Sequence, residues 1–186
     1  MAIKIIYFVH GTTIDNEQHK AAGWNDVELS KKGIMQTLAL RDEECINDID
    51  LVITSDLKRA VDSAKNIFVD IKDMTIIQDC RIRECNYGNL NGQDSSLIKY
   101  EEHIEQAFPN GESLKDVEKR VRAFCNEIIK KYDGKTIAIV SHRAPQLALD
   151  VIIKKISWEE AIEKDWRKNK AWQPGWTLKI GTDSKF

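Results

Sequence analysis

Two short apolar runs, each followed by a histidine, constrain this chain more than any other feature of its sequence. Residues 3–9 lead directly into His10, and residues 136–140 lead into Ser141 and His142. Runs of this length, nearly all apolar and rich in isoleucine, are typical of buried parallel strands. Because ligands bind at the carboxyl ends of such strands, the sequence predicts a two-histidine site at one edge of a sheet.

Other predicted strands alternate with predicted helices along the chain. Further strands are expected at 50–54, 74–78 and 176–180, loops at 14–29 and 79–93, and helices at 30–45 (N-cap Ser30), 55–68 (N-cap Ser55), 113–129 (N-cap Ser113), 147–153 and just after Ser157. The last strand alternates apolar and polar residues, as an edge strand does. This order predicts an α/β fold, a three-layer α/β/α sandwich around a mostly parallel sheet.

Length, charge and cysteine content narrow the classes of function. The 186 residues fit a single domain, residues 1–186, with a substantial core. A net charge of -2 gives no reason to expect nucleic acid or membrane as a partner, and no apolar run is long enough to span a bilayer. The four cysteines show neither a Cys-x-x-Cys pair nor zinc-site spacing, so we expect reduced thiols in a cytoplasmic protein and no metal site. The sequence leaves the oligomeric state open.

A series of short motifs runs through nearly the whole chain in a recognisable order. The motifs are His10-Gly11-x-Thr13, Asn16, Gly23-Trp24-x-Asp26, Leu29-Ser30-x-x-Gly33-x-x-Gln36, Ser55-Asp56-Leu57-x-Arg59-Ala60, Arg83-Glu84 with Gly88 and Gly92, Gly111-Glu112-Ser113 and Val140-Ser141-His142. In this order they resemble the histidine phosphatase superfamily, also called phosphoglycerate mutase-like, and in particular its small phosphatase branch. The resemblance implies the phosphoglycerate mutase-like fold and hydrolysis of phosphomonoesters without a metal or other cofactor.

The resemblance also implies a role for each of four catalytic residues. His10 would attack phosphorus through Nε2 and form a phosphohistidine, with Nδ1 keeping its proton against a backbone carbonyl. Arg59 would grip phosphate oxygens with its guanidinium fork. His142 would face the phosphoryl group from the second strand, and Glu84 would protonate the leaving oxygen and then activate water. The expected partner is a small phosphorylated metabolite.

Four further residues are assigned to substrate binding: Gly11, Thr13, Asn16 and Arg143. Each single residue also has a plainer interpretation. A histidine after a strand is often structural, an arginine such as Arg59 in a helix is often solvated or ion-paired, and Glu84 beside Arg83 fits a surface ion pair. The motifs taken together favour the catalytic interpretation.

Two positions depart from the superfamily pattern. The superfamily has an arginine just before the nucleophilic histidine, and this chain has Val9 there; it usually has glycine after the second histidine, and this chain has Arg143. One hypothesis is that Arg143 enters the pocket and replaces the guanidinium missing at position 9. The alternative is that Arg143 points to solvent and the phosphate site is weakened.

Three functions therefore stay open beside hydrolysis. Val9 supports a catalytically weakened protein that binds or senses a phospholigand, and it also allows an enzyme of altered specificity. A phosphotransferase of the phosphoglycerate mutase type is the third. Near the end of the chain, tryptophans and basic residues either pack the terminus onto the core or form a lid over the substrate: Trp166, Arg167, Lys168, Lys170, Trp172 and Trp176.

Overall fold

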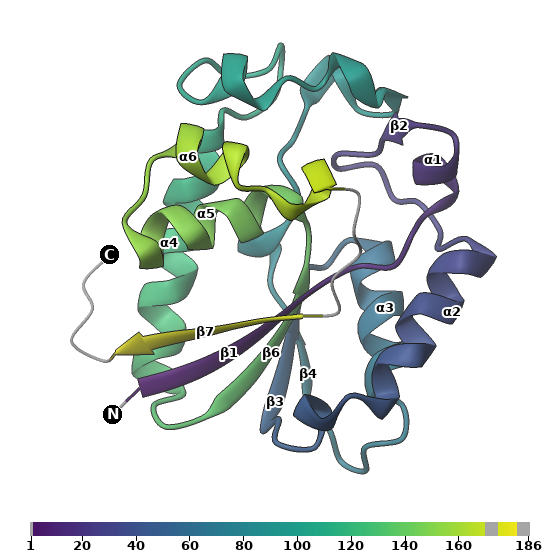
Figure 1. Cartoon of the computed structure of the whole chain (residues 1–186), viewed down its shortest axis with the longest axis vertical. Coiled ribbons are helices and arrows are strands. Elements are labelled where there is room, and N and C mark those ends of the chain that lie inside the picture. Colours follow the sequence, from purple (N-terminus) through teal and green to yellow (C-terminus); the bar gives the residue numbers. More distant parts are fainter. Residues whose placement is uncertain (1, 170–174, 182–186) are drawn as a thin grey trace.

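A five-stranded sheet forms the centre of the computed structural model, which describes residues 2–169 and 175–181 (Figure 1). The strand order is β4-β3-β6-β1-β7. The strands are β1 (Ala2–Val9), β3 (Leu51–Thr54), β4 (Ile76–Gln78), β6 (Thr136–Ser141) and β7 (Trp176–Gly181). The first four are parallel and β7 is antiparallel to β1, so the predicted, mostly parallel sheet with an edge strand at 176–180 is confirmed.

Helices cover both faces of this sheet. Figure 1 shows α2 and α3 on one side and α4 and α5 on the other. The longer helices are α2 (Lys31–Ala39), α3 (Lys58–Phe68), α4 (Leu114–Lys131), α5 (Arg143–Lys154) and α6 (Trp158–Glu163). The three-layer α/β/α sandwich predicted from the sequence is confirmed.

The central strands bury both of their faces, which explains their nearly continuous apolar sequence. Along β1, Ile3, Ile5 and Tyr7 enter the core beneath α4 and α5, whereas Ile6 and Phe8 enter the core beneath α3. All five are at most 2% exposed. Burying one such side chain contributes about 1.5–3 kcal/mol to stability, so these residues hold β1 firmly in the core. His10 follows β1 directly, and its position is therefore fixed by the strand.

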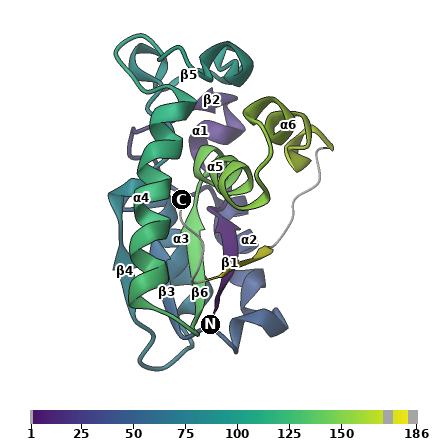
Figure 2. The ribbon, with the colours of Figure 1, turned by 90° about the vertical axis from the view of Figure 1, so that its left-hand side faces the viewer.

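The strand ends are covered by a cap of short elements. Residues 14–29, predicted as a loop, contain α1 (Ile14–Glu17) and β2 (Lys20–Ala21), and β2 pairs with β5 (Gln93–Asp94). Figure 2 shows α1, β2 and β5 together beyond the carboxyl ends of β1 and β6. One-turn 3-10 helices make up much of the remaining chain: η1 (Leu40–Asp42), η2 (Glu44–Ile46), η3 (Cys80–Ile82), η4 (Gly88–Leu90), η5 (Ser95–Leu97), η6 (Tyr100–His103) and η7 (Trp166–Asn169).

Several predicted helix and strand boundaries were wrong. Ser55 does not cap α3: the N-cap is Leu57, and the Asp26 carboxylate accepts a hydrogen bond from the Lys58 N–H at 2.9 Å instead. The helix expected at 147–153 begins earlier, at Arg143, which places Pro145 in its first turn, where proline is tolerated.

The remaining differences are in length. The strand expected at 74–78 is limited to β4, and the helix expected at 30–45 ends at Ala39 and continues as 3-10 turns. The predicted N-cap Ser113 is confirmed, and it forms a capping box through reciprocal hydrogen bonds with Asp116. Within the described ranges, no helix has the length and apolar character that a bilayer crossing requires.

Candidate active site

The two predicted histidines meet at the carboxyl ends of neighbouring strands. β1 and β6 pair in parallel with Val9 opposite Ser141, and the His10 N–H continues the ladder by donating to the Ser141 carbonyl at 3.0 Å. The two imidazole centroids, of His10 and His142, are 5.1 Å apart. The predicted juxtaposition of the two histidines is confirmed.

The hydrogen bond at Nδ1 of His10 fixes the tautomer of its ring and leaves a lone pair on Nε2. Its Nδ1 lies 2.8 Å from the carbonyl oxygen of Gly11, which can only accept a hydrogen bond, so Nδ1 carries the proton. Nε2 therefore presents a lone pair, and the Nε–H of Arg59 points toward it at 3.3 Å. Burial, and then the charge of Arg59, lower the pKa of His10 to about 3, so the ring is neutral near pH 7.

His142 is completely buried and has two unused ring nitrogens. Neither Nδ1 nor Nε2 has a hydrogen-bond partner among the described residues. Burial, followed by the charge of Arg59, holds the pKa of His142 well below its usual range. The Tyr7 hydroxyl fixes the backbone by donating to the His142 carbonyl at 2.7 Å. The neutral ring therefore has one N–H beside His10 with no partner among the described residues.

Arg59 lies in the first turn of α3 and is only 2% exposed, so the solvated-helix interpretation was wrong. Its Nη1 donates to the Asn25 carbonyl at 3.0 Å and its Nη2 to the Gly23 carbonyl at 2.7 Å. Burial lowers the pKa of Arg59, yet an arginine stays charged at physiological pH. The two carbonyls fix the guanidinium so that a permanent positive charge faces Nε2 of His10.

Glu84 is a buried carboxylate at the amino end of α5, and the surface-pair interpretation was wrong. It is 7% exposed. Oε1 accepts from the Ala144 N–H at 3.0 Å and from the Cys85 N–H at 2.9 Å, and Oε2 accepts from the Arg143 N–H at 3.2 Å. Arg83 instead forms a two-pronged ion pair with Asp56. The free N–H groups of a helix start thus hold the carboxyl group in the cavity wall.

Arg120 positions the segment that carries Glu84, and the sequence analysis did not single it out. Its Nη1 donates to the carbonyls of Arg81 and Arg83 at 2.8 and 2.7 Å, and its Nη2 donates to the carbonyl of Glu84 at 2.9 Å. Its ion pair with Glu112 completes this clamp. In the sequence, Arg120 is one of several charged residues on an amphipathic helix, so no local signal marks it.

The loop after His10 places two of three predicted binding residues in the cavity. Thr13 and Asn16 line it, although they also cap α1: the Thr13 hydroxyl accepts from the Asn16 N–H, and the Asn16 side-chain oxygen accepts from the Thr13 N–H. Thr12 lines it as well. Gly11 does not: its N–H donates to Ser63. A Cβ at Gly11 would lie 2.5 Å from the Gly33 carbonyl oxygen, so this glycine allows a close approach of loop and helix.

Arg143 and Val9 both line the cavity. One nitrogen of the Arg143 guanidinium is engaged: Nε donates to Oδ2 of Asp165 at 2.7 Å, and the group lies over the Tyr100 ring at 4.4 Å. Val9 contributes only apolar surface. Arg167, which belongs to η7, reaches the same wall.

The C-terminal segment meets the cavity through part of the predicted group of aromatic and basic residues. Trp166 and Arg167 line it, whereas Lys168 does not. Trp176 packs the end of the chain onto the core, with its ring 6.3 Å from Tyr7 and 5.5 Å from Trp166. Lys170 and Trp172 lie outside the described residues.

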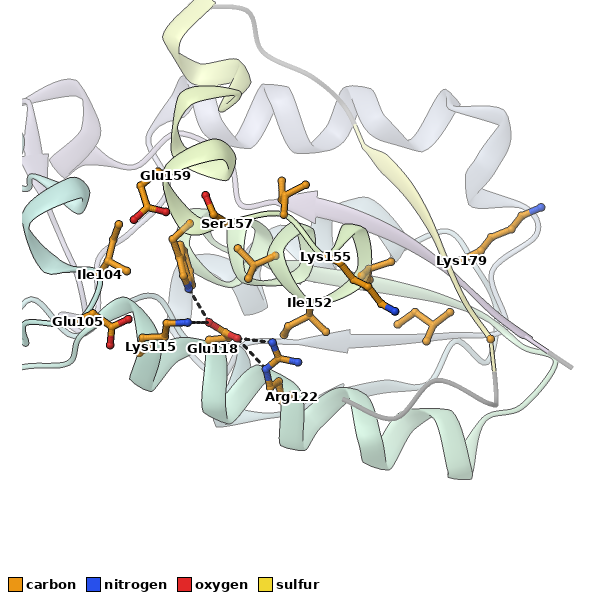
Figure 3. A pocket seen from close by; sticks show the side chains of 16 residues that line it. Ile104, Glu105, Lys115, Glu118, Arg122, Ile152, Lys155, Ser157, Glu159 and Lys179 are labelled. Carbon is orange, nitrogen blue, oxygen red and sulfur yellow. Dashed lines mark hydrogen bonds and ion pairs between the residues drawn. The ribbon is translucent and has the colours of Figure 1, made fainter.

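His10, Arg59 and Glu84 line one cavity of about 340 Å³, whereas the fully buried His142 is not among its lining residues. A larger cavity of about 750 Å³ lies between α4, α5, α6 and β7 (Figure 3). Its central Glu118 is already paired with Arg122, Lys115 and the Trp158 indole, and no histidine or cysteine is among the described residues that line it. The smaller cavity is therefore the candidate active site.

Residues 2–169 and 175–181 include no group of three or more His, Cys, Asp or Glu that could hold a metal ion.

Comparison with known proteins decides the family. The model of the histidine phosphatase superfamily, branch 1, matches residues 6–173. The chain belongs to this superfamily. The histidine phosphatases include phosphatases and mutases, and they act through a phosphohistidine without a metal ion.

Relatives of both kinds resemble this histidine phosphatase. Phosphoserine phosphatase 1 of Hydrogenobacter thermophilus is 29% identical over 157 residues, which cover 79% of this chain and 74% of the relative. A 2,3-bisphosphoglycerate-dependent phosphoglycerate mutase of Gloeobacter violaceus is 31% identical over 147 residues, covering 72% and 67%. The structure of Bacillus stearothermophilus YhfR shares the fold, with a TM-score of 0.81 at 23% identity over 98% of this chain and 93% of YhfR.

Proposed function

We propose that this protein hydrolyses phosphomonoesters by transferring the phosphoryl group first to Nε2 of His10 and then to water. One observation carries the proposal: a neutral imidazole, with its proton fixed on Nδ1 by the Gly11 carbonyl, presents Nε2 to the buried cation Arg59 inside a cavity that also contains Glu84. Phosphoryl transfer needs a positioned nucleophile and charge stabilisation, and this arrangement supplies both.

In the first step, the Nε2 lone pair of His10 bonds to phosphorus while the bond from phosphorus to the ester oxygen breaks. Glu84, in its protonated form, gives its proton to that oxygen, and the alcohol leaves. The phosphorylated ring is cationic, and its Nδ1–H still donates to the Gly11 carbonyl, which stabilises it. Arg59 and His142 donate to the phosphoryl oxygens, where negative charge is spread.

In the second step, the Glu84 carboxylate takes a proton from a water molecule as the water oxygen bonds to phosphorus. The bond between phosphorus and Nε2 breaks, inorganic phosphate forms, and His10 returns to its neutral state with Glu84 protonated. The low pKa of His10 serves this cycle, because the ring does not take up a proton that would remove the attacking lone pair at pH 5 to 8.

We expect a small phosphorylated metabolite as substrate. A cavity of about 340 Å³ is of the size that small-molecule sites have, and relatives act on phosphorylated metabolites: one solved phosphoserine phosphatase is bound to 3-phosphoglyceric acid. The four free cysteines, two of them buried, support the proposal of a reducing, cytoplasmic compartment.

A phospholigand-binding protein with little turnover is the second candidate. It is favoured by Val9, which lines the cavity without charge where the superfamily resemblance calls for an arginine. The position of Glu84 favours the enzyme, since a binding protein needs no proton donor beside the phosphate. The mutase alternative differs in requiring return of the phosphoryl group to a second acceptor.

Hydrolysis of p-nitrophenyl phosphate and a panel of metabolite phosphomonoesters, with EDTA present, tests these functions. We expect turnover that survives chelation and is abolished in His10→Ala. No turnover above that of His10→Ala, with phosphate still bound, would support the binding protein instead. Isomerisation of a phosphoglycerate faster than its hydrolysis would support the mutase.

A further inference from the structure

Arg167 carries a buried guanidinium nitrogen that no described residue uses. Its Nη1 donates to Oδ1 of Asp165 at 2.9 Å and to the Gln146 side-chain oxygen at 3.0 Å, whereas Nη2 is buried without a hydrogen-bond partner in the described chain. The same is true of the Trp166 indole N–H, and both residues line the active-site cavity. Buried donors without a partner are costly, so a ligand that supplies an acceptor to this wall would be favoured.

Asp165 holds this guanidinium in place and leaves the wall positively charged. Its side chain is completely buried, and it accepts from Arg167 through Oδ1 and from Arg143 through Oδ2. Burial opposes ionisation of Asp165, but the charges of Arg167 and Arg143 hold its pKa below the usual value. One carboxylate facing two guanidiniums leaves one uncompensated positive charge, which suits an anion.

The positive charge of Arg167 also acts on His10, the proposed nucleophile. After burial and Arg59, Arg167 is a further cause of the lowered pKa of His10, whereas Arg143 is not among the causes. Arg143 is fixed between Asp165 and the Tyr100 ring. Of the two arginines in this wall, Arg167 is therefore the one with a buried, unpartnered guanidinium nitrogen and an electrostatic effect at His10.

We propose that Arg167, oriented by Asp165 and Gln146, donates Nη2–H to a non-bridging oxygen of the phosphoryl group at His10, and is thus a second phosphate-binding arginine beside Arg59. The assignment rests on the proposed function for the position of the phosphoryl group. It is an alternative to the hypothesis that Arg143 makes this contact. It also explains how the cavity keeps two cationic groups for phosphate although position 9 is a valine: one comes from α3 and the other from the C-terminal segment.

The test is binding of inorganic phosphate to the full chain, measured by isothermal titration calorimetry. Arg167→Met removes the donor, and we expect the phosphate Kd to rise about 10- to 100-fold, the effect of one charge-assisted hydrogen bond. Lys168→Met is the matched control, because it removes the same charge from the neighbouring residue, which is outside the cavity wall. We expect its Kd to stay within about twofold of wild type.

A second variant, Arg167→Lys, distinguishes loss of the hydrogen-bond donor from loss of local structure. A lysine keeps a positive charge beside Asp165 but has no planar fork, so phosphate affinity should recover only in part. Wild-type affinity in Arg167→Met, or equal losses in Arg167→Met and Lys168→Met, would overturn the proposal. Arg167-dependent phosphate binding by a protein that hydrolyses no ester would sustain this inference while refuting the proposed hydrolysis.

Discussion

The buried, neutral His142 should make the stability of the protein depend on pH in a way that a single substitution removes. Its pKa is well below the ordinary value of about 6.5 in the folded state, so the ring is neutral when folded and takes up a proton when the chain unfolds in acid. The stabilising contribution is therefore complete above about pH 6.5 and is lost as the pH falls toward the folded-state pKa. Each pH unit between the ordinary pKa and the folded-state pKa costs about 1.36 kcal/mol per proton.

Urea unfolding followed by circular dichroism at pH 7.5, 6.5, 5.5 and 4.5 measures this effect. Below pH 6.5, the free energy of unfolding of His142→Asn should fall less steeply than that of wild type, by up to about 1.36 kcal/mol for each pH unit. His19→Asn, which removes an exposed imidazole, is the control and should follow the wild-type slope. Parallel curves for wild type and His142→Asn would refute a buried neutral ring at this position.

Three further substitutions test separate parts of the site. Glu84→Gln should lower kcat by about 10²- to 10⁴-fold with alkyl phosphates and less with p-nitrophenyl phosphate, whose leaving group needs no proton; equal losses would contradict the acid role. Arg120→Met should lower kcat about 100-fold and leave phosphate affinity within about twofold, because it only releases the backbone of Glu84; a larger effect on phosphate Kd than on kcat would show a direct binding role. Gly11→Ala, whose Cβ meets the Gly33 carbonyl at 2.5 Å, should reduce the free energy of unfolding by about 1–3 kcal/mol; an unchanged urea midpoint would argue against this packing.

The strands, layers and paired histidines were predictable because they follow from local pattern. An apolar run of seven residues before His10 has few alternatives to a buried strand, and strands that alternate with helices produce a parallel sheet. Parallel pairing then brings the ends of β1 and β6 together, so the proximity of His10 and His142 follows from topology. Arg59 and Glu84 depended on the superfamily resemblance, since either residue alone fits a solvated surface.

Contacts made across long distances in sequence were not predictable. Arg120 clamps three carbonyls about 36 to 39 residues away, and nothing in the helix that carries it distinguishes it from its charged neighbours. Arg143 was noticed because it departs from a motif, whereas Arg167 was noticed only as part of a basic, tryptophan-rich tail. Both arginines pair with Asp165, and no motif in the sequence marks this residue. Its importance is visible only in the structure, where its side chain is completely buried.

Direct detection of the phosphohistidine tests the central claim. The protein is mixed with p-nitrophenyl phosphate, quenched in base, in which phosphohistidine survives, and digested for mass spectrometry. A peptide that contains His10 with one added phosphoryl group, and no modification in His10→Ala, is the predicted result. Steady turnover by wild type with no phosphoryl group on His10 at any quench time, including during the first turnover, would contradict the account.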